Sequence, residues 1–224
     1  MKYIILLIVG FSILVGGCSD NHIDPDSEVY DEFQKALDEL DREIESAELY
    51  TGTRIGYYED GSKKYETPYV NGKEHGTVIY YNEDGSKESE TPYVNDKRHG
   101  TKIEYRSDGS KKEETPYVNG KEHGTKIWYN EDGSKSAETP YVNGKMHGTV
   151  ISYNEDGSKS HETPFVDGKM HGTEIRYNAD GSKESETPYV NNAKHGTEIE
   201  YRSDGSKFSE SVYKNGKIIS RKDF

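Results

Sequence analysis

The chain has few of the residues from which a hydrophobic core is built. Leucine is absent after Leu49, and from residue 51 onward about 12% of residues are Leu, Ile, Val or Phe, below the roughly 20% at which disorder becomes the default expectation. Charged residues make up 32% of the chain and hydrophobic ones 30%. This composition argues against a large α/β enzyme. The 19 tyrosines and 23 glycines leave a thin β structure or disorder as the alternatives.

Cysteine occurs once, at Cys18, so the chain can form no internal disulfide. A positively charged start and an apolar run over 3–15 precede it, and this run is shorter than the roughly 20 residues that span a bilayer. The layout predicts a signal peptide over 1–17. Its end, Leu-Val-Gly-Gly-Cys, resembles the lipobox of bacterial lipoproteins. The resemblance implies cleavage before Cys18, acylation of Cys18, and anchoring in the cell membrane or outer membrane, outside the cytoplasm; an ordinary secreted or cytosolic protein is the alternative.

An acidic segment follows a short polar tether over 18–24. An aspartate–proline pair marks a helix start, which predicts an amphipathic helix over 25–49. Residues 26–48 include ten acidic and two basic residues, so this segment contributes −8 to the chain's net charge of −13. Apolar residues recur at alternating spacings of three and four, namely Tyr30, Phe33, Leu37, Leu40, Ile44 and Ala47. This 30–47 seam predicts either packing over the first edge of the following domain or self-association as a short coiled coil.

The rest of the chain repeats every 24 residues. Seven units tile residues 51–218, and such a period is typical of an array of supersecondary units. An Asp-Gly-Ser turn sequence occurs in every unit. A His-Gly pair recurs at His75, His99, His123, His147, His171 and His195.

Each unit is expected to form a β-hairpin. In the unit 75–98, Thr77, Ile79 and Tyr81 stand at positions that are constant in all units, whereas the residues between them vary. This period of two predicts a strand with one buried, constant face. An Asp-Gly turn and a second strand ending in Thr-Pro-Tyr-Val follow, and Asn-Gly closes four of the units.

The sequence therefore predicts an all-β repeat array: tandem antiparallel β-hairpins that form an elongated single-layer meander sheet of fourteen strands, preceded by one amphipathic α-helix. The repeated proline is expected at a strand end or bulge, because a central strand needs its backbone N–H. In the last unit, Phe208, Val212, Ile218 and Ile219 are expected to cap the array. Residues 219–224 are expected to form a C-terminal tail.

The stretch Tyr-Val-Asn-Gly-Lys-x-His-Gly, found at 117–124 and 141–148 and followed by Tyr129 and Tyr153, resembles MORN repeats of the divergent bacterial type. The resemblance implies a rod-like or gently curved array of hairpins that serves as an interaction surface. Some eukaryotic members are associated with phosphoinositide-rich membranes. Bacterial relatives include antitoxin or immunity components and surface proteins of host-associated species.

Several ligand classes are disfavoured by the residues themselves. The array over 51–224 carries 26 basic and 30 acidic residues, evenly spread, whereas a nucleic-acid or phosphoinositide surface is expected to show a basic stripe. Successive repeat histidines lie two strands apart, roughly 9–10 Å, too far to share a zinc ion that needs ligands at about 2 Å. The turns place Tyr80 and Thr91 where a calcium loop requires carboxylates. No metal or cofactor is predicted.

The sequence offers no catalytic constellation: it lacks a nucleophilic cysteine, Gly-x-Ser-x-Gly and a phosphate-binding loop, so an enzyme is not expected. Tyr80 and Trp128 occupy one variable repeat position roughly 19 Å apart, and these residue types are frequent interface anchors; they are the candidate partner-binding residues. The function predicted is that of a membrane-anchored lipoprotein that binds a protein at the cell envelope or surface. The alternatives are an immunity-type protein that neutralises a secreted toxin, and a cell-wall or glycan binder.

Overall fold

The computed structural model describes residues 28–224, which divide into a helical part ending at Leu49 and an array that begins at Tyr50. The predicted signal peptide, Cys18 and the tether lie outside the described residues. The helix is α2 (Glu28–Glu48), with Glu28 and Asp31 in its first turn, where the helix dipole favours negative charge. Among the described residues no helix is long and apolar enough to cross a membrane.

Within α2, the predicted seam is amphipathic as expected. Tyr30, Phe33, Leu37 and Leu40 are partly buried, whereas Ile44 is 40% exposed. The acidic residues of α2 lie between the seam positions in the sequence and are mostly exposed. Self-association through this seam stays a prediction.

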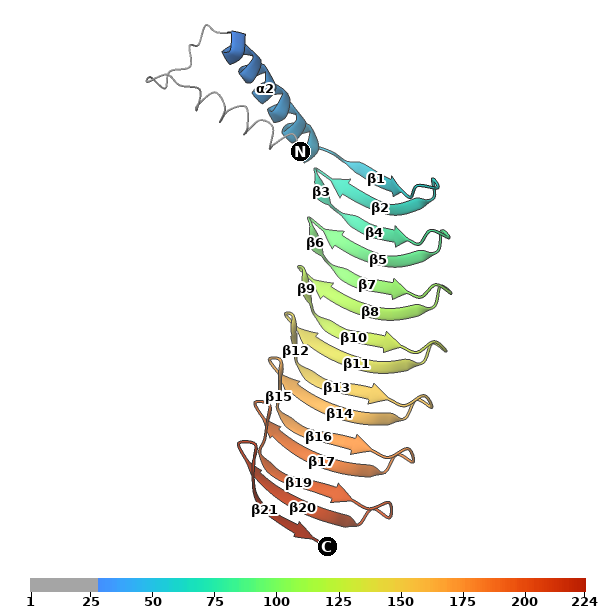
Figure 1. Cartoon of the computed structure of the whole chain (residues 1–224), viewed down its shortest axis with the longest axis vertical. Coiled ribbons are helices and arrows are strands. Elements are labelled where there is room, and N and C mark those ends of the chain that lie inside the picture. The colour runs from blue at the N-terminus through green and yellow to red at the C-terminus, as the bar shows by residue number, and fades with distance from the viewer. Residues whose placement is uncertain (1–27) are drawn as a thin grey trace, which may run out of the picture. The chain divides into compact units, whose positions relative to one another are not determined.

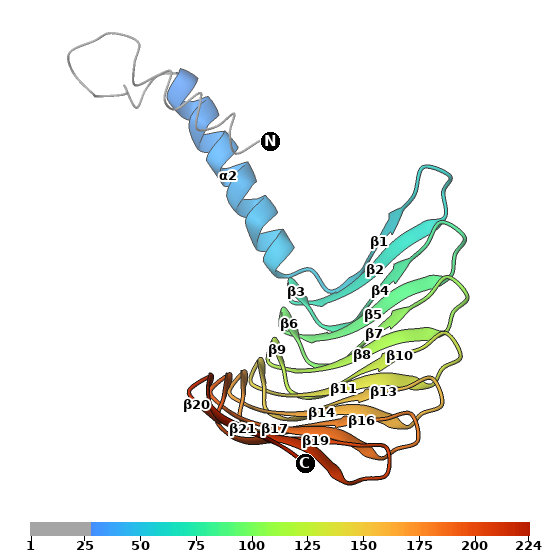
Figure 2. The same ribbon diagram turned by 60° about the horizontal axis from the view of Figure 1, so that its bottom comes forward.

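The array is a single antiparallel sheet of 21 strands (Figure 1), which confirms the predicted hairpin meander. Its six-residue strands are β1 (Gly52–Tyr57), β4 (Gly76–Tyr81), β7 (Gly100–Tyr105), β10 (Gly124–Tyr129), β13 (Gly148–Tyr153), β16 (Gly172–Tyr177) and β19 (Gly196–Tyr201). Its eight-residue strands are β2 (Lys63–Val70), β5 (Lys87–Val94), β8 (Lys111–Val118), β11 (Lys135–Val142), β14 (Lys159–Val166), β17 (Lys183–Val190) and β20 (Lys207–Lys214). Figure 2 shows these strands bent along their length.

Each hairpin is followed by a short strand that the sequence did not predict. Six of these strands have two residues: β3 (Lys73–Glu74), β6 (Lys97–Arg98), β9 (Lys121–Glu122), β12 (Lys145–Met146), β15 (Lys169–Met170) and β18 (Ala193–Lys194). The seventh, β21 (Lys217–Asp223), ends the sheet. Each two-residue strand ends before the glycine of the His-Gly pair, and at Gly76 the φ angle of 116° breaks the extended backbone.

The turns form as their residues dictate. In the turn between β4 and β5, Gly85 has a φ of 83°, and the Asp84 carboxylate accepts a hydrogen bond of 2.8 Å from the backbone N–H of Ser86. The same bond recurs in the other Asp-Gly-Ser turns. At the opposite end, Asn71 and Gly72 both have positive φ, which suits a two-residue hairpin turn.

The predicted place of the repeated proline is wrong, because Pro68 lies inside β2 and pairs in regular register with Thr53. On its other side, β2 pairs with β4 only at Tyr65 and Glu66 and with β3 only from Tyr69, so the ladder is open at Pro68. Its carbonyl accepts a 3.0 Å bond from the His75 N–H in that gap. The nitrogen of Pro68 therefore points into this gap, where no neighbouring strand requires an N–H donor.

The expectation of a buried constant face is also wrong. Thr77 and its equivalents in the other units are exposed, and within residues 28–224 Val78 is the one buried apolar side chain, 4% exposed. The buried residues are mainly the threonines before proline, such as Thr115 at 1% exposure, and these lie on the same face as the variable positions. The physical reason is that one layer of sheet has nothing to cover its second face.

The face that carries Thr77 and Ile79, which we call the constant face, is held by repeated polar contacts. Isoleucine and glutamate alternate across the sheet in one row, because Ile79 pairs with Glu90 and Glu90 with Ile103. Each row glutamate also meets the lysine three residues before it in its own strand, as at Lys63 and Glu66, 2.7 Å apart. These contacts replace an apolar core.

The last strand, β21, covers the end of the array through its backbone pairing with β20. The His-Gly pair of earlier units is replaced by Ile219-Ser220, so β21 runs on and pairs along most of β20. Residues 219–223 thus belong to this strand. The predicted apolar cap is wrong in one respect: Phe208, Ile218 and Ile219 are 46%, 55% and 62% exposed, because no second layer lies over them.

Candidate functional site

The variable positions of all units line up in one continuous row across the sheet, which we call the variable row. It runs on the face opposite the constant face, with one residue from each long strand, since directly paired residues share a face. In order its members are Gly56, Tyr65, Tyr80, Ser89, Glu104, Glu113, Trp128, Ala137, Ser152, His161, Arg176, Ser185, Glu200 and Ser209.

Most hairpins pair a large residue of the row with a small one. Tyr80 faces Ser89, and Trp128 faces Ala137. In the first unit Gly56 faces Tyr65, and a Cβ atom at Gly56 would lie 2.1 Å from the Tyr65 ring. The tyrosine ring therefore occupies the space above the glycine backbone. Side-chain volumes along the row are matched across strands.

Tyr80 stands beside a second aromatic residue that the sequence analysis missed. Its side chain is 44% exposed, and its ring centre is 6.1 Å from that of Tyr65, with an angle of 49° between the planes. Tyr65 occupies the facing repeat position, which varies between units as freely as the position of Tyr80. That variation is the signal that could have found it.

Trp128 is held by charged neighbours. The residue is 36% exposed, and the Lys126 Nζ atom lies 4.1 Å from its ring centre. The same Nζ lies 2.8 Å from the Glu113 carboxylate, which also accepts a 2.6 Å bond from the Thr115 hydroxyl. Glu113 is 7% exposed, so its charge is paired away from water, as a buried carboxylate requires. This arrangement fixes the cation against the indole ring.

The row brings Tyr80 and Trp128 onto one face without bringing them together. Ser89, Glu104 and Glu113 lie between them in the register. Four strand steps correspond to about 19 Å. A ligand that touches both residues must therefore extend across at least three units.

A hollow of about 480 Å³ opens on this face between units 2 and 3, which span 75–98 and 99–122. Two glutamates and two lysines line it, including the ion pair of Lys102 with Glu104, 2.5 Å apart. The hydrogen bond from Lys102 lowers the pKa of Glu104. The charges in this hollow balance.

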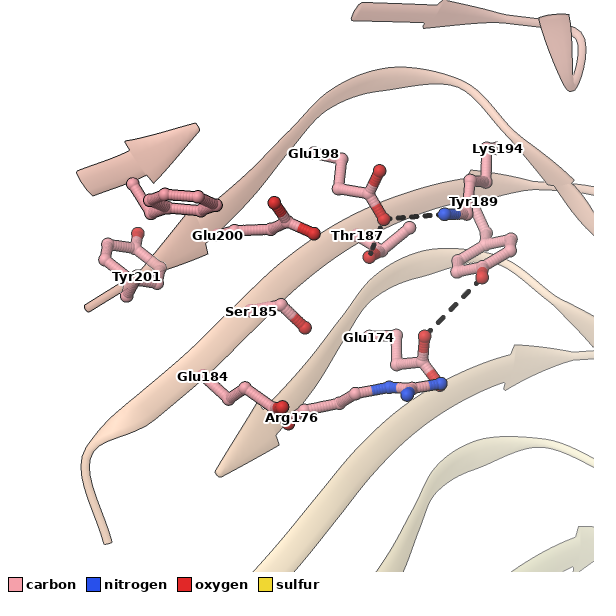
Figure 3. A pocket seen from close by; sticks show the side chains of 11 residues that line it. Glu174, Arg176, Glu184, Ser185, Thr187, Tyr189, Lys194, Glu198, Glu200 and Tyr201 are labelled. Carbon is pink, nitrogen blue, oxygen red and sulfur yellow. Dashed lines mark hydrogen bonds and ion pairs between the residues drawn. The ribbon is translucent and has the colours of Figure 1, made fainter. Parts of the chain in front are cut away.

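A second hollow, of about 390 Å³, lies between units 6 and 7 (171–194 and 195–218) and is shown in Figure 3. Lys194 donates a 2.6 Å bond to Glu198, and the Thr187 hydroxyl donates one of 3.0 Å. Burial disfavours the Glu198 carboxylate, but these bonds outweigh it and lower its pKa. Four glutamates and two cations line this hollow, which leaves an excess of two negative charges.

The repeat histidines lie at the turns between units. The His147 Nδ1 atom is 3.7 Å from Asp167, and that of His195 is 3.2 Å from the Asn215 amide oxygen. Over residues 28–224, no three His, Cys, Asp or Glu side chains gather in a way that could hold a metal ion.

The geometry of the repeats matches a known family. The model of the MORN repeat variant matches residues 50–71, 74–95, 122–143 and 170–191. This chain is a MORN-repeat protein. The three remaining units share the period and the strand register of the matched ones, so all seven units form one array. No curated protein sequence matches the chain.

Among solved structures, the chain is similar to a chain of an S. aureus TarM mutant in complex with fondaparinux, alpha-GlcNAc-glycerol and UDP. The sequence identity is 12% and the TM-score 0.26. The match covers 85% of this chain and spans 27% of that chain.

Proposed function

We propose that this MORN-repeat protein is a non-enzymatic binding protein, anchored by lipid at Cys18 outside the cytoplasm of a bacterium. It holds a protein partner on the face that carries the variable row, which we call the variable face. The variable row is the observation that carries the proposal. Fourteen paired strands present a row in which residue identity changes from step to step, on a backbone that repeats almost unchanged. Such a surface is suited to the recognition of one specific partner.

The order of residues along the row favours a protein partner over a glycan. A linear glycan repeats the same unit, so it would be matched by the same side chains in successive repeats. The row instead passes from Tyr80 through Glu104 to Trp128, at one repeat position in three successive units. Aromatic residues in a mixed polar setting are typical of protein interfaces.

The binding part of the proposal is tested by a triple variant, Tyr65→Ser/Tyr80→Ser/Trp128→Ser. The partner is captured from envelope extracts with the full-length protein, and capture is expected to be lost in the variant while its circular dichroism stays that of the parent. A matched control, Thr77→Ser/Thr101→Ser/Thr125→Ser, changes the constant face and is expected to capture the partner normally. Equal loss in both variants would refute a role of the variable face.

The anchor is tested separately. A labelled fatty acid is expected to be incorporated into the full chain and not into Cys18→Ser, which is expected to leave the membrane fraction. Two or more acyl chains anchor a protein stably. Retention of Cys18→Ser in the membrane would contradict the proposed anchor and leave the proposed binding surface untouched.

A second candidate is an immunity protein for a secreted toxin, which is favoured by the net charge of −13 and by the negative excess in the hollow of units 6 and 7. A basic toxin would be attracted to both. This role requires a tight one-to-one complex with a toxin encoded beside the gene. If cells that lack this protein grow normally when that toxin is expressed, the immunity role is refuted.

A further inference from the structure

In the middle of the variable row, four successive members carry no acidic residue, lysine or arginine. Trp128, Ala137 and Ser152 follow one another in the row. Val150 lies two residues before Ser152 on β13 and therefore on the same face. Met146 joins them, because it pairs with Tyr141, which lies on the same face as Ala137. All five side chains are at least partly exposed, so units 4 and 5 (123–146 and 147–170) present an apolar centre.

Hollows lined by charged residues lie on both sides of this centre and differ in net charge. The hollow of units 2 and 3 is lined by two glutamates and two lysines, so its charges cancel. The hollow of units 6 and 7 has four glutamates against Arg176 and Lys194. One of the four, Glu184, is exposed and makes no hydrogen bond or ion pair within the described part of the chain. Its charge is available to a ligand.

This sequence of surfaces has the layout of a protein interface. Protein interfaces combine an apolar centre, where tryptophan and methionine are enriched, with a polar rim. Charged residues of the partner that are opposite in sign to those of the rim fix the orientation of the partner and speed association. The partly exposed ring of Trp128, held in place by Lys126 and Glu113, loses little conformational freedom on binding, which favours affinity.

We infer that units 4 and 5 form the centre of the interface, and that the protein partner places an apolar side chain against Trp128 and Val150 while its lysine or arginine side chains lie over the hollow of units 6 and 7. The inference rests on the proposed function and names the chemistry of the partner. The partner is therefore oriented on the array: its basic end binds over units 6 and 7. Its other end lies over units 2 and 3, where the hollow is neutral and favours no charge of either sign.

Short random peptides displayed on phage provide a probe that needs no knowledge of the natural partner. They are selected on the full-length protein in detergent micelles, and enriched peptides are synthesised for calorimetric titration. We expect them to combine an aromatic or aliphatic residue with a cluster of lysine or arginine on one side. Trp128→Ala is expected to weaken their binding about 30-fold, the loss of an interface anchor.

The charged half of the inference has its own variant. Glu184→Gln/Glu200→Gln is expected to weaken the peptides about tenfold at low salt, and this difference should shrink at about 1 M salt, where screening extends over roughly 3 Å. Thr125→Ala, on the constant face of the strand that carries Trp128, serves as the matched control and is expected to change nothing.

The outcomes separate the inference from the proposed function. Peptides that depend on Tyr65 and Tyr80 but not on Trp128, or that carry acidic residues in place of basic ones, overturn the inference and leave binding by the variable face intact. If the selected peptides are insensitive to every substitution in the row, or if selection enriches no binding peptide, both the inference and the proposed function are contradicted.

Discussion

The ammonium group of Lys126 lies 4.1 Å from the centre of the Trp128 ring. Because the Glu113 carboxylate on the neighbouring strand holds the same nitrogen at 2.8 Å, the cation cannot leave the ring without leaving a buried negative charge unpaired. The contact is therefore a fixed part of the array. Trp128 is the one tryptophan of the chain, so its fluorescence reports this contact directly.

Replacing the lysine tests this arrangement. Lys126→Met is expected to make the indole more mobile, seen as lower fluorescence anisotropy, and to lower the free energy of unfolding by about 2 kcal/mol, since Glu113 loses its cation. Adding Glu113→Gln should restore part of the stability and none of the anisotropy. Unchanged anisotropy in Lys126→Met would show that the cation does not hold the ring.

The first unit allows a test of volume matching in the row. Gly56→Ala places a methyl group where the Tyr65 ring lies, which is expected to cost about 1–3 kcal/mol in unfolding free energy and to separate Tyr65 from Tyr80. The double variant Gly56→Ala/Tyr65→Ser removes the obstructing ring and should recover most of that loss. Chemical denaturation measures both. If the single variant is as stable as the parent, the ring does not lie over Gly56.

The conformation and hydrogen bond of Asp96 allow us to predict the order of stability of variants at this position. Asp96 has a φ of 62°, and its carboxylate accepts a 2.7 Å bond from the backbone N–H of Glu74 in the preceding unit. Asn192 makes the equivalent bond to Met170 at 2.8 Å. Asp96→Asn should therefore be neutral, Asp96→Gly slightly destabilising, and Asp96→Ala destabilising by about 1–2 kcal/mol, because alanine loses the bond and disfavours positive φ.

Denaturation midpoints measure this order. A variant series in which alanine equals asparagine would show that neither the backbone angle nor the bond between neighbouring turns contributes. Asn71→Asp offers a control, because the Asn71 side chain stands one position earlier in its turn and is not the acceptor.

The Asp-Gly-Ser turns predict loss of stability in acid. Hydrogen bonds from the serine hydroxyl and backbone N–H lower the pKa of every turn aspartate, namely Asp60, Asp84, Asp108, Asp132, Asp156, Asp180 and Asp204. A group whose pKa is lower in the folded state contributes stability that is fully present above the unfolded pKa, about 3.9, and is lost as the pH falls through the folded pKa.

The urea midpoint should therefore stay level between about pH 7 and pH 5 and fall below about pH 4. Ser134→Ala/Ser158→Ala removes two hydroxyl donors, which lie 2.6 Å from their aspartates, and should make the fall shallower. A midpoint that does not change on acidification would contradict the role of these turns.

Much of the fold could be predicted from the sequence because the period is exact in length. The repeated turns fix where each hairpin begins and ends, and the acidic heptad segment indicates α2. Alternation along the first strand correctly assigned Thr77 and Val78 to opposite faces. It could not say which face is buried, since that depends on whether a second layer covers the sheet. The polar Thr115 is buried while the constant Thr101 is exposed.

The candidate site was predicted in part. Tyr80 and Trp128 lie on one face and in one row, but the role of either residue stays a prediction. The facing positions, such as Tyr65 and Glu113, could not be predicted from the sequence, because cross-strand register depends on bulges such as the one between Tyr80 and Tyr81. The short strands could not be predicted either, since two residues carry no periodic signal. The interior proline was misplaced because the gap in the ladder at Pro68 is a property of three strands together.

Site-specific photo-crosslinking tests the central claim most directly. A photoreactive residue is placed in the living cell at Glu104 or Ser152 in the variable row, or at Thr101 or Thr149 on the constant face of the same strands. Crosslinks to one and the same protein are expected from both row positions and from neither threonine position. Crosslinks of equal yield from the two faces, or from the constant face alone, would contradict the assignment of the variable row as the binding surface.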